Sequence, residues 1–373
     1  MYQIGTEITI EPSELVAGGS ALAKVDGFPI FAVNVYPGDV ARVRITEVKK
    51  GFARAELVAI ERPSPLRRVA PCPIAEECGG CDWTALRLNA QLRAKERILI
   101  ESLRRIGKID PKTLPPINIH PSPLNYRLRS RLHGDGDAVG FYAMQSHRVV
   151  PLAKECEVVG LETARAFGTR PSPLAPLPAL RGEGDMEVWE VDGRIVTSGE
   201  LNIEGYAVST ETFFQVNRHL LQTMLRLVEN LAIGKTAVDL YAGVGFFSVP
   251  IARVCESVTA VEGAYASFQY AKRNVPANVT LVHAPVESWV ERMPHADFVF
   301  LDPPRSGAKP NVIAAIAAKT ERRICFLACD PVTFARDANR LLASGWRLST
   351  LDLLDLFPNT HHVETLSSFE RAG

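Results

Sequence analysis

The second half of the chain alternates short apolar runs with segments that have the spacing of helices. Four such runs are T-A-V-D-L (236–240), V-T-A-V-E (258–262), A-D-F-V-F-L-D (296–302) and I-C-F-L-A-C (324–329). Strands buried on both faces of a parallel sheet have this near-continuous apolar composition, and their alternation with helices is typical of doubly wound α/β domains. The sequence therefore predicts a Rossmann-like α/β domain over residues 206–373.

The first three runs lead into residues that can bind a ligand. The first is followed by Gly243 and Gly245, the second ends at Glu262, and the third ends at Asp302. Parallel sheets bind ligands beyond the carboxyl ends of their strands, where glycines admit a ligand and an acid about 20 residues later holds ribose hydroxyls. Ser248 stands where the dinucleotide fingerprint has its third glycine, which disfavours NAD and leaves room for S-adenosylmethionine. On these residues alone, a purely structural strand-turn-helix remains the alternative.

Cys329 ends the fourth run and is followed by Asp and Pro. Addition of a thiolate to carbon 6 of uracil makes carbon 5 nucleophilic, and a base must then remove the carbon 5 proton so that the thiol can leave. Cys329 is the candidate nucleophile. Glu364 is the candidate base, because it lies near the chain end, where a strand can return beside residues 324–329. Taken singly, a cysteine at a strand end is usually a buried apolar residue, which is our interpretation of Cys255 and Cys325.

The composition is that of a folded protein without a membrane segment. The chain has 373 residues, of which 46% are hydrophobic and 23% charged, and its formal net charge is zero. No apolar run approaches the roughly 20 residues of a membrane span, and the N-terminus lacks the basic and apolar regions of a signal peptide. We therefore expect a cytoplasmic protein with no membrane partner. We also expect it to be a monomer. The length favours two or three domains.

Three regions precede the α/β domain. Residues 1–60 contain five short strands separated by turn residues such as G-G, D-G and P-G-D, which predicts a small β-barrel related to the oligonucleotide-binding folds. Residues 61–114 hold a cysteine cluster and a segment of helical spacing that stops at Gly107. Residues 115–205 are expected to be rich in strands, with an exposed Pro-rich loop at 170–185.

The cysteine cluster comprises Cys72, Cys78 and Cys81, and Cys156 is a candidate fourth member. Disulfides are not expected in a reducing compartment, so metal binding is the simpler interpretation. Four cysteines in this arrangement could hold zinc nearly as well as an iron-sulfur cluster.

The region after the cluster is basic. Between Arg87 and Arg131 there are eleven Lys and Arg residues and three acids. Such an excess could be the electrostatic footprint of RNA, although solvated faces of a helix and a strand would give the same pattern.

Together these motifs resemble the S-adenosylmethionine-dependent RNA (uracil-5-)-methyltransferases. The resemblance covers nearly the whole chain: a TRAM-like barrel at the N-terminus, the C-x5-C-G-G-C cluster with the later Cys156, F-F-Q-V-N (213–217), D-L-Y-A-G-V-G, V-E-G, L-D-P-P-R-x-G, A-C-D-P and D-L-F-P-N-T-H-H-V-E-T. Small departures are Phe246 and Pro285, where some members carry Asn, and Asp330, which replaces a frequent Asn.

The resemblance implies a role for each matching residue. Cys329 would be the nucleophile and Glu364 the proton-abstracting base. Contacts to S-adenosylmethionine would come from Gln215, Tyr241, Gly243, Glu262 and Asp302. A [4Fe-4S] cluster would be held by Cys72, Cys78, Cys81 and Cys156. Residues 61–114 would then carry the cluster and a basic helix, and residues 115–205 would form a central RNA-binding domain.

The resemblance also implies the substrate. We expect methylation of a uridine in RNA, with 23S ribosomal RNA preferred because the TRAM-like barrel resembles that of ribosomal members, and transfer RNA as the alternative. A cytosine-5 RNA methyltransferase is a rival, but such enzymes typically use a second cysteine in a Pro-Cys pair, which D-P-P-R lacks. A non-catalytic RNA-binding assembly factor is another rival, and it would have no reason to keep both Cys329 and Glu364.

Overall fold

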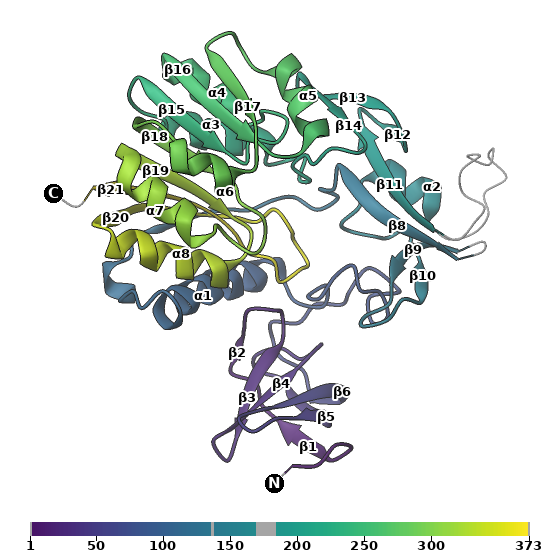
Figure 1. The fold of residues 1–373 in the computed structure, drawn as a ribbon. Helices are drawn as coiled ribbons and strands as arrows, with labels where there is room; N and C mark the ends of the chain where they lie inside the picture. The colour runs from purple at the N-terminus through teal and green to yellow at the C-terminus, as the bar shows by residue number, and fades with distance from the viewer. Residues whose placement is uncertain (1, 136–137, 169–183, 372–373) are drawn as a thin grey trace. The chain divides into compact units, whose positions relative to one another are not determined.

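The computed structural model describes residues 2–135, 138–168 and 184–371 (Figure 1). The chain divides into two compact units, each made of separate stretches of sequence. The first comprises Met1–Ile98, Arg131–Met186 and Phe357–His362, and the second comprises Leu99–Ser130, Glu187–Leu356 and Val363–Gly373. Within the described ranges, no helix has the length and apolar character needed to span a membrane. Most of the predicted Pro-rich loop, residues 170–183, lies outside the described residues.

The first unit begins with a six-stranded sheet in the order β1-β5-β6-β4-β3-β2. Its strands are β1 (Glu7–Ile10), β2 (Glu14–Leu15), β3 (Ala21–Val25), β4 (Phe28–Ala32), β5 (Val40–Val48) and β6 (Ala53–Arg62). In β5 the alternate side chains of Ala41, Val43 and Ile45 are buried, as expected when one face of a sheet packs on a core. Asp26 and Gly27 both have positive φ, which suits the tight turn between β3 and β4. The five predicted strands are confirmed, and β2 is an addition.

The rest of the first unit surrounds the cysteine cluster. It contains β9 (Ala138–Tyr142), β10 (Val149–Pro151), α2 (Leu161–Phe167) and most of β8 (Arg129–Asp135). Strand β9 pairs antiparallel with both β8 and β10. Residues 72–87, all of which are described, form no helix and no strand, but Cys78 makes an isolated bridge to Ala143. The predicted helix is confirmed as α1 (Leu88–Arg105), which ends just before Gly107.

The second unit is built on an eight-stranded sheet in the order β17-β16-β15-β18-β19-β21-β20-β7. Its strands are β7 (Ile117–His120), β15 (Thr236–Leu240), β16 (Ser257–Glu262), β17 (Val279–His283), β18 (Ala296–Leu301), β19 (Thr320–Ala328), β20 (Trp346–Leu354) and β21 (Glu364–Arg371). Strands β15 to β19 are parallel, and β21 runs antiparallel between β19 and β20. Residues 117–120, which the sequence analysis included in the central region, form β7 at the edge of this sheet.

Helices and short hairpins complete the second unit. The helices are α3 (Leu221–Leu231), α4 (Ser248–Val254), α5 (Tyr265–Asn274), α6 (Val286–Trp289), α7 (Pro310–Lys319) and α8 (Pro331–Ala343), with short 3-10 turns at Pro111–Thr113 and Val290–Arg292. The hairpins pair β11 (Gly184–Val191) with β12 (Arg194–Val196), and β13 (Glu200–Ile203) with β14 (Tyr206–Ser209). After β15, strands β16 and β17 lie on one side of it, and strands β18 and β19 lie on the other. In such sheets a ligand crevice lies at the carboxyl ends of the strands where the order reverses, here β15 and β18.

Candidate functional site

The turn after β15 is shaped by residues with left-handed backbone. Tyr241, Gly243 and Gly245 have φ values of 63°, 57° and 86°. A Cβ on Gly245 would lie 2.6 Å from a methyl carbon of Val275, so the glycine is required by close packing as well as by its backbone conformation. The Tyr241 hydroxyl donates to Glu287 Oε1 at 3.3 Å, and burial raises the pKa of this tyrosine well above its usual value.

Glu262, the last residue of β16, binds this turn directly. Its Oε2 accepts a hydrogen bond from the Gly243 amide at 2.7 Å, and its Oε1 accepts one from the Ala264 amide at 2.6 Å. The predicted pairing of a glycine turn with an acid at the end of the next strand is therefore present in the structure. Glu262 thus links the turn after β15 to the backbone that follows β16.

Asp302 follows β18 at the same edge of the sheet. It accepts a hydrogen bond from Gln215 Nε2 at 3.2 Å, which brings together two of the predicted cofactor residues. Burial, followed by the negative charge of Asp239, raises the pKa of Asp302 to about 7. Burial likewise raises the pKa of Asp239 to about 7, and its Oδ2 accepts a hydrogen bond of 2.5 Å from Ser248. The sequence analysis did not select Asp239, although an acid inside the apolar run T-A-V-D-L is a signal for it.

Cys329 and Glu364 lie at the end of the strand pair β19 and β21. The antiparallel register ends with the pair Ala328 and Thr365; Cys329 is the residue that follows Ala328, and Glu364 is the residue that precedes Thr365. The charge of Glu364 acts on the Cys329 thiol, so the two side chains are near each other. The expectation that a strand near the chain end returns beside residues 324–329 is confirmed.

The surroundings of this pair disfavour negative charge. Burial, together with the charges of Glu364 and Asp302, raises the pKa of the Cys329 thiol to about 12, and the Arg305 guanidinium opposes this rise. Glu364 is 5% exposed, and its burial, followed by the charge of Asp302, raises its pKa well above the usual value. The thiol is therefore protonated at neutral pH. Glu364, once ionised, is a stronger base than an exposed glutamate.

The four predicted metal-binding cysteines line one small pocket of the first unit, and none of them is joined in a disulfide. The Gly80 amide donates to Cys78 Sγ at 3.4 Å. A Cβ on Gly79 would lie 2.8 Å from the Tyr142 carbonyl, so the two glycines of C-G-G-C let the loop pack closely against β9. Among the residues that the structure describes, no group of three or more His, Cys, Asp and Glu is arranged to hold a single metal ion.

The donor set of this pocket nevertheless fits an iron-sulfur cluster. Thiolates bind the separate iron atoms of a cluster, so they need not converge on one ion, and a backbone amide directed at a sulfur is a typical supporting contact. Apolar residues such as Phe141, Leu152 and Val158 complete the lining.

Part of the predicted basic surface is engaged within the chain. Arg104 and Arg105 both pair with Glu101, at 2.7 and 2.9 Å. The Arg129 guanidinium lies 5.0 Å from the centre of the Phe213 ring, which is 57% exposed, and 5.6 Å from that of Trp189. A planar cation stacked beside an exposed aromatic ring is the kind of surface on which unpaired bases stack.

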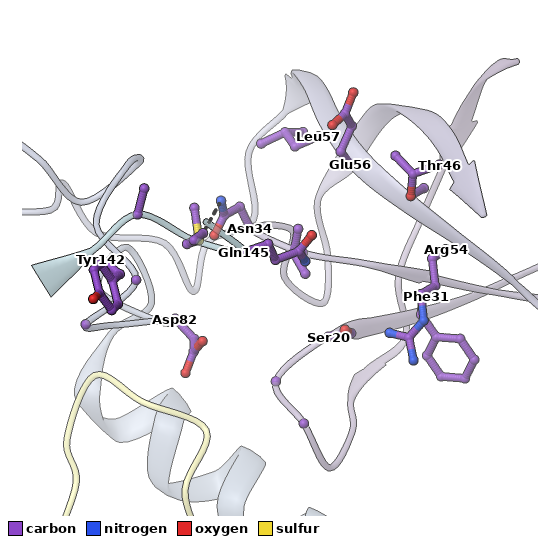
Figure 2. Close-up of a pocket in the computed structure, with 18 of the residues that line it drawn as sticks. Ser20, Phe31, Asn34, Thr46, Arg54, Glu56, Leu57, Asp82, Tyr142 and Gln145 are labelled. Atoms are coloured by element: carbon purple, nitrogen blue, oxygen red, sulfur yellow. Dashed lines mark hydrogen bonds between the residues drawn. The ribbon is translucent and has the colours of Figure 1, made fainter. Parts of the chain in front are cut away.

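A groove other than the cysteine pocket also lies wholly within the first unit (Figure 2). Its lining includes the acids Glu47, Glu56 and Asp82 along with Arg54 and His133. Arg54 pairs with Glu47 at 3.2 Å. This balance of charge does not favour a phosphate backbone, and we assign the groove no role in binding RNA.

Comparison with known proteins gives matches at both ends of the chain. Residues 291–371 match the family model described as tRNA (Uracil-5-)-methyltransferase, and residues 3–58 match the TRAM domain. An uncharacterized RNA methyltransferase of Streptomyces coelicolor is 30% identical, over 99% of this chain and 94% of the relative. A protein of Shewanella denitrificans named 23S rRNA (uracil(1939)-C(5))-methyltransferase RlmD is 28% identical, over 99% and 97%.

Among solved structures, the chain is similar to the Pyrococcus abyssi tRNA (uracil-54, C5)-methyltransferase in complex with S-adenosyl-L-homocysteine. The TM-score is 0.68 over 98% of this chain and 100% of that chain, with 20% sequence identity. This likeness and the TRAM match confirm the predicted fold class, a Rossmann-like α/β domain preceded by a TRAM-like N-terminal domain.

Proposed function

The chain belongs to the S-adenosylmethionine-dependent RNA (uracil-5-)-methyltransferase family, and on that premise we propose that it methylates a specific uridine through a covalent adduct between Cys329 and the base. The observation that supports this mechanism is the antiparallel pairing of β19 with β21, whose last pair, Ala328 and Thr365, is directly followed by Cys329 and preceded by Glu364. A nucleophile and a proton acceptor at the same end of two paired strands can act on neighbouring atoms of one ring.

In the proposed mechanism the Cys329 sulfur, as the thiolate, forms a bond to carbon 6 of uracil, and the electron pair of the carbon 5–carbon 6 double bond moves into an enolate. S-adenosylmethionine, when bound, would supply the methyl group for carbon 5, with its sulfur–methyl bond broken and S-adenosyl-L-homocysteine as the leaving group. Glu364 then removes the carbon 5 proton, the double bond forms again, and the thiolate leaves. The target base must first leave its stack, because neither face of carbon 6 is accessible within a helix.

The residues at the carboxyl ends of β15, β16 and β18 are proposed to hold the methyl donor. Glu262 would accept hydrogen bonds from the ribose, and Gly243 lets the ligand approach the backbone. Tyr241, Gln215 and Asp302 would contact the rest of the donor. The hydrogen bond from Gln215 to Asp302 supports a shared role for these two side chains.

We propose 23S ribosomal RNA as the substrate. The N-terminal TRAM match and the RlmD-named relative support this choice. Transfer RNA is the second candidate, favoured by the family model over residues 291–371. Mapping 5-methyluridine in RNA from cells with and without the gene decides between them, since the lost position lies either in ribosomal or in transfer RNA.

We also propose that Cys72, Cys78, Cys81 and Cys156 hold a [4Fe-4S] cluster, because all four line one pocket. The cluster would order the segment before α1. Anaerobic purification followed by iron and sulfide analysis and an absorbance scan tests this proposal. Iron and sulfide near four per chain are expected of the named cluster, whereas stoichiometric zinc without iron overturns the assignment.

The covalent mechanism is tested with RNA that contains 5-fluorouridine. Fluorine at carbon 5 cannot leave as a cation, so the protein should form a gel-stable adduct with this RNA and S-adenosylmethionine. Cys329→Ala should abolish the adduct. Cys325→Ala, which changes a thiol within β19 four residues before Cys329, should retain it. An adduct that survives Cys329→Ala would exclude Cys329 as the nucleophile.

A further inference from the structure

Asn359 is a fully buried polar residue in an unusual backbone conformation. It is 0% exposed, and its φ is 65°, in the left-handed region that asparagine tolerates better than most residues. It lies in the loop Phe357–His362, which is part of the first unit, although the residues on either side belong to the second. Five residues after Asn359, Glu364 begins strand β21.

Every polar group of Asn359 has a partner in the first unit. Its Oδ1 accepts hydrogen bonds from Arg68 at 3.1 Å and from Gln91 at 2.9 Å, and its backbone amide donates to Gln91 Oε1 at 2.8 Å. Its Nδ2 donates to Glu157 Oε2 at 3.0 Å. A buried network with all its members paired is rigid, because any displacement leaves a desolvated polar group without a partner.

Some partners of Asn359 lie next to the cysteines in the chain. Glu157 follows Cys156 in the chain, and the amides of Asp82 and Trp83, which follow Cys81, both donate to the Asn359 carbonyl at 3.0 Å. Asn359 also lines the pocket that the four cysteines share. The loop is thus joined to the cysteine pocket through one side chain and its own peptide groups.

The loop is also held at both ends. The Phe357 carbonyl accepts a hydrogen bond of 2.9 Å from Lys95, which is buried, and His361 Nδ1 lies 2.6 Å from Asp82 Oδ2. The chain leaves this network at His362 and reaches Glu364 two residues later.

We propose that Asn359 is a positioning residue that sets the start of β21 and so the placement of Glu364. The inference rests on the proposed covalent mechanism. That mechanism separates two steps, because adduct formation requires Cys329 whereas resolution requires Glu364. Loss of Asn359 should impair the second step and leave the first intact.

Asn359→Gly is the informative variant, because glycine adopts positive φ freely and only the side-chain contacts are lost. On RNA with ordinary uridine we expect turnover to fall about tenfold or more and the methylated adduct to accumulate on denaturing gels, since misplacement of a base of this kind costs such factors. On 5-fluorouridine RNA, where no proton is removed, the rate of adduct formation should stay within about twofold of the unaltered protein.

Asn34→Gly is the matched control. Asn34 lies in the first unit and also has a positive φ, of 59°. Its side-chain Nδ2 lies 4.0 Å from Met144 Sδ, which is a weak contact (Figure 2). Turnover and adduct fraction should not change in this variant. If Asn359→Gly fails to fold, Asp82→Asn decides instead. Its side chain is 38% exposed, and weakening its contact to His361 should give the same adduct accumulation to a smaller extent.

The outcomes are distinct. Failure of the unaltered protein to form any adduct with 5-fluorouridine RNA overturns the covalent mechanism itself. A normal adduct in the unaltered protein, combined with unchanged turnover in Asn359→Gly, overturns only the positioning role. Equal loss of adduct formation and turnover in Asn359→Gly also overturns it, because the defect would then not be confined to proton removal.

Discussion

The backbone amide of Gly243 donates a 2.7 Å hydrogen bond to the carboxylate of Glu262. With the Ala264 amide on the other oxygen, the carboxylate joins the turn after β15 to the end of β16. A single acid therefore shapes the glycine turn. In the proposed function its remaining lone pairs would accept hydrogen bonds from the ribose of the methyl donor.

Glu262→Gln should weaken binding of the methyl donor. In glutamine, one of the two carboxylate oxygens is replaced by an NH2 group. This NH2 group would face a backbone N–H, so one hydrogen bond of the turn is lost. The ribose would also lose a charged acceptor. Hydrogen bonds to charged groups are worth about 1.5–3 kcal/mol, which corresponds to roughly a 10- to 100-fold rise in Kd for S-adenosyl-L-homocysteine by calorimetry. Glu256→Gln, at an exposed acid paired with Lys235, should leave Kd unchanged. Equal affinities in the two variants would contradict the role of Glu262.

Glu364→Gln should trap the methylated adduct on RNA with ordinary uridine. Without a carboxylate the carbon 5 proton is not removed, and turnover should fall about 10²- to 10⁴-fold. Denaturing gels of reactions with radiolabelled methyl donor measure the trapped fraction. Glu370→Gln changes an acid of the same strand that pairs with Arg323, and it should turn over normally. Loss of activity without a labelled adduct would rule out Glu364 as the base of the second step.

The reactivity of Cys329 in the free protein should rise with pH throughout the neutral range. Its pKa is raised to about 12, chiefly by burial and then by Glu364 and Asp302, so the thiol is protonated and each added pH unit increases the thiolate about tenfold. Iodoacetamide labelling of the Cys329 peptide, followed by mass spectrometry between pH 7 and 9, measures this slope. A plateau below pH 8 would show that the thiolate is stabilised in the free protein.

Asp239→Asn should stabilise the free protein at pH 8. The pKa of Asp239 is raised from 3.8 to about 7 in the folded state. The free energy of unfolding therefore falls as the pH rises from the pKa of the unfolded chain to the pKa of the folded protein. The substitution removes this cost, by about 1–4 kcal/mol at pH 8, and the gain should shrink toward pH 5. Denaturant unfolding at both pH values measures it. Asp297→Asn should have the opposite sign, because backbone amides of Lys235 and Thr236 lower the pKa of Asp297.

The strand ends of the α/β domain could be predicted because each run is short and mostly apolar and gives way to residues of another kind, such as Gly243, Glu262 and Asp302. The pairing of Glu262 with the glycine turn and the return of β21 beside β19 followed from this pattern. By contrast, β7 joins the sheet from more than 200 residues before its partner β20, and no local pattern records such a pairing. Asn359 was missed for the same reason, since its partners at 68, 91 and 157 come from distant segments.

The antiparallel pairing of β19 with β21, at the end of which Cys329 and Glu364 lie, restricts how a chain of this kind can change in length. A residue inserted within β19 or β21 shifts the register by one and turns one of the two side chains to the opposite face of the sheet. Inserted residues in the turns beyond these strands leave the pairing intact. The number of residues between the thiol and the acid can therefore vary through insertions in the turns. Within the paired strands, a single inserted residue is not tolerated, because it would turn one of the two side chains away from the other.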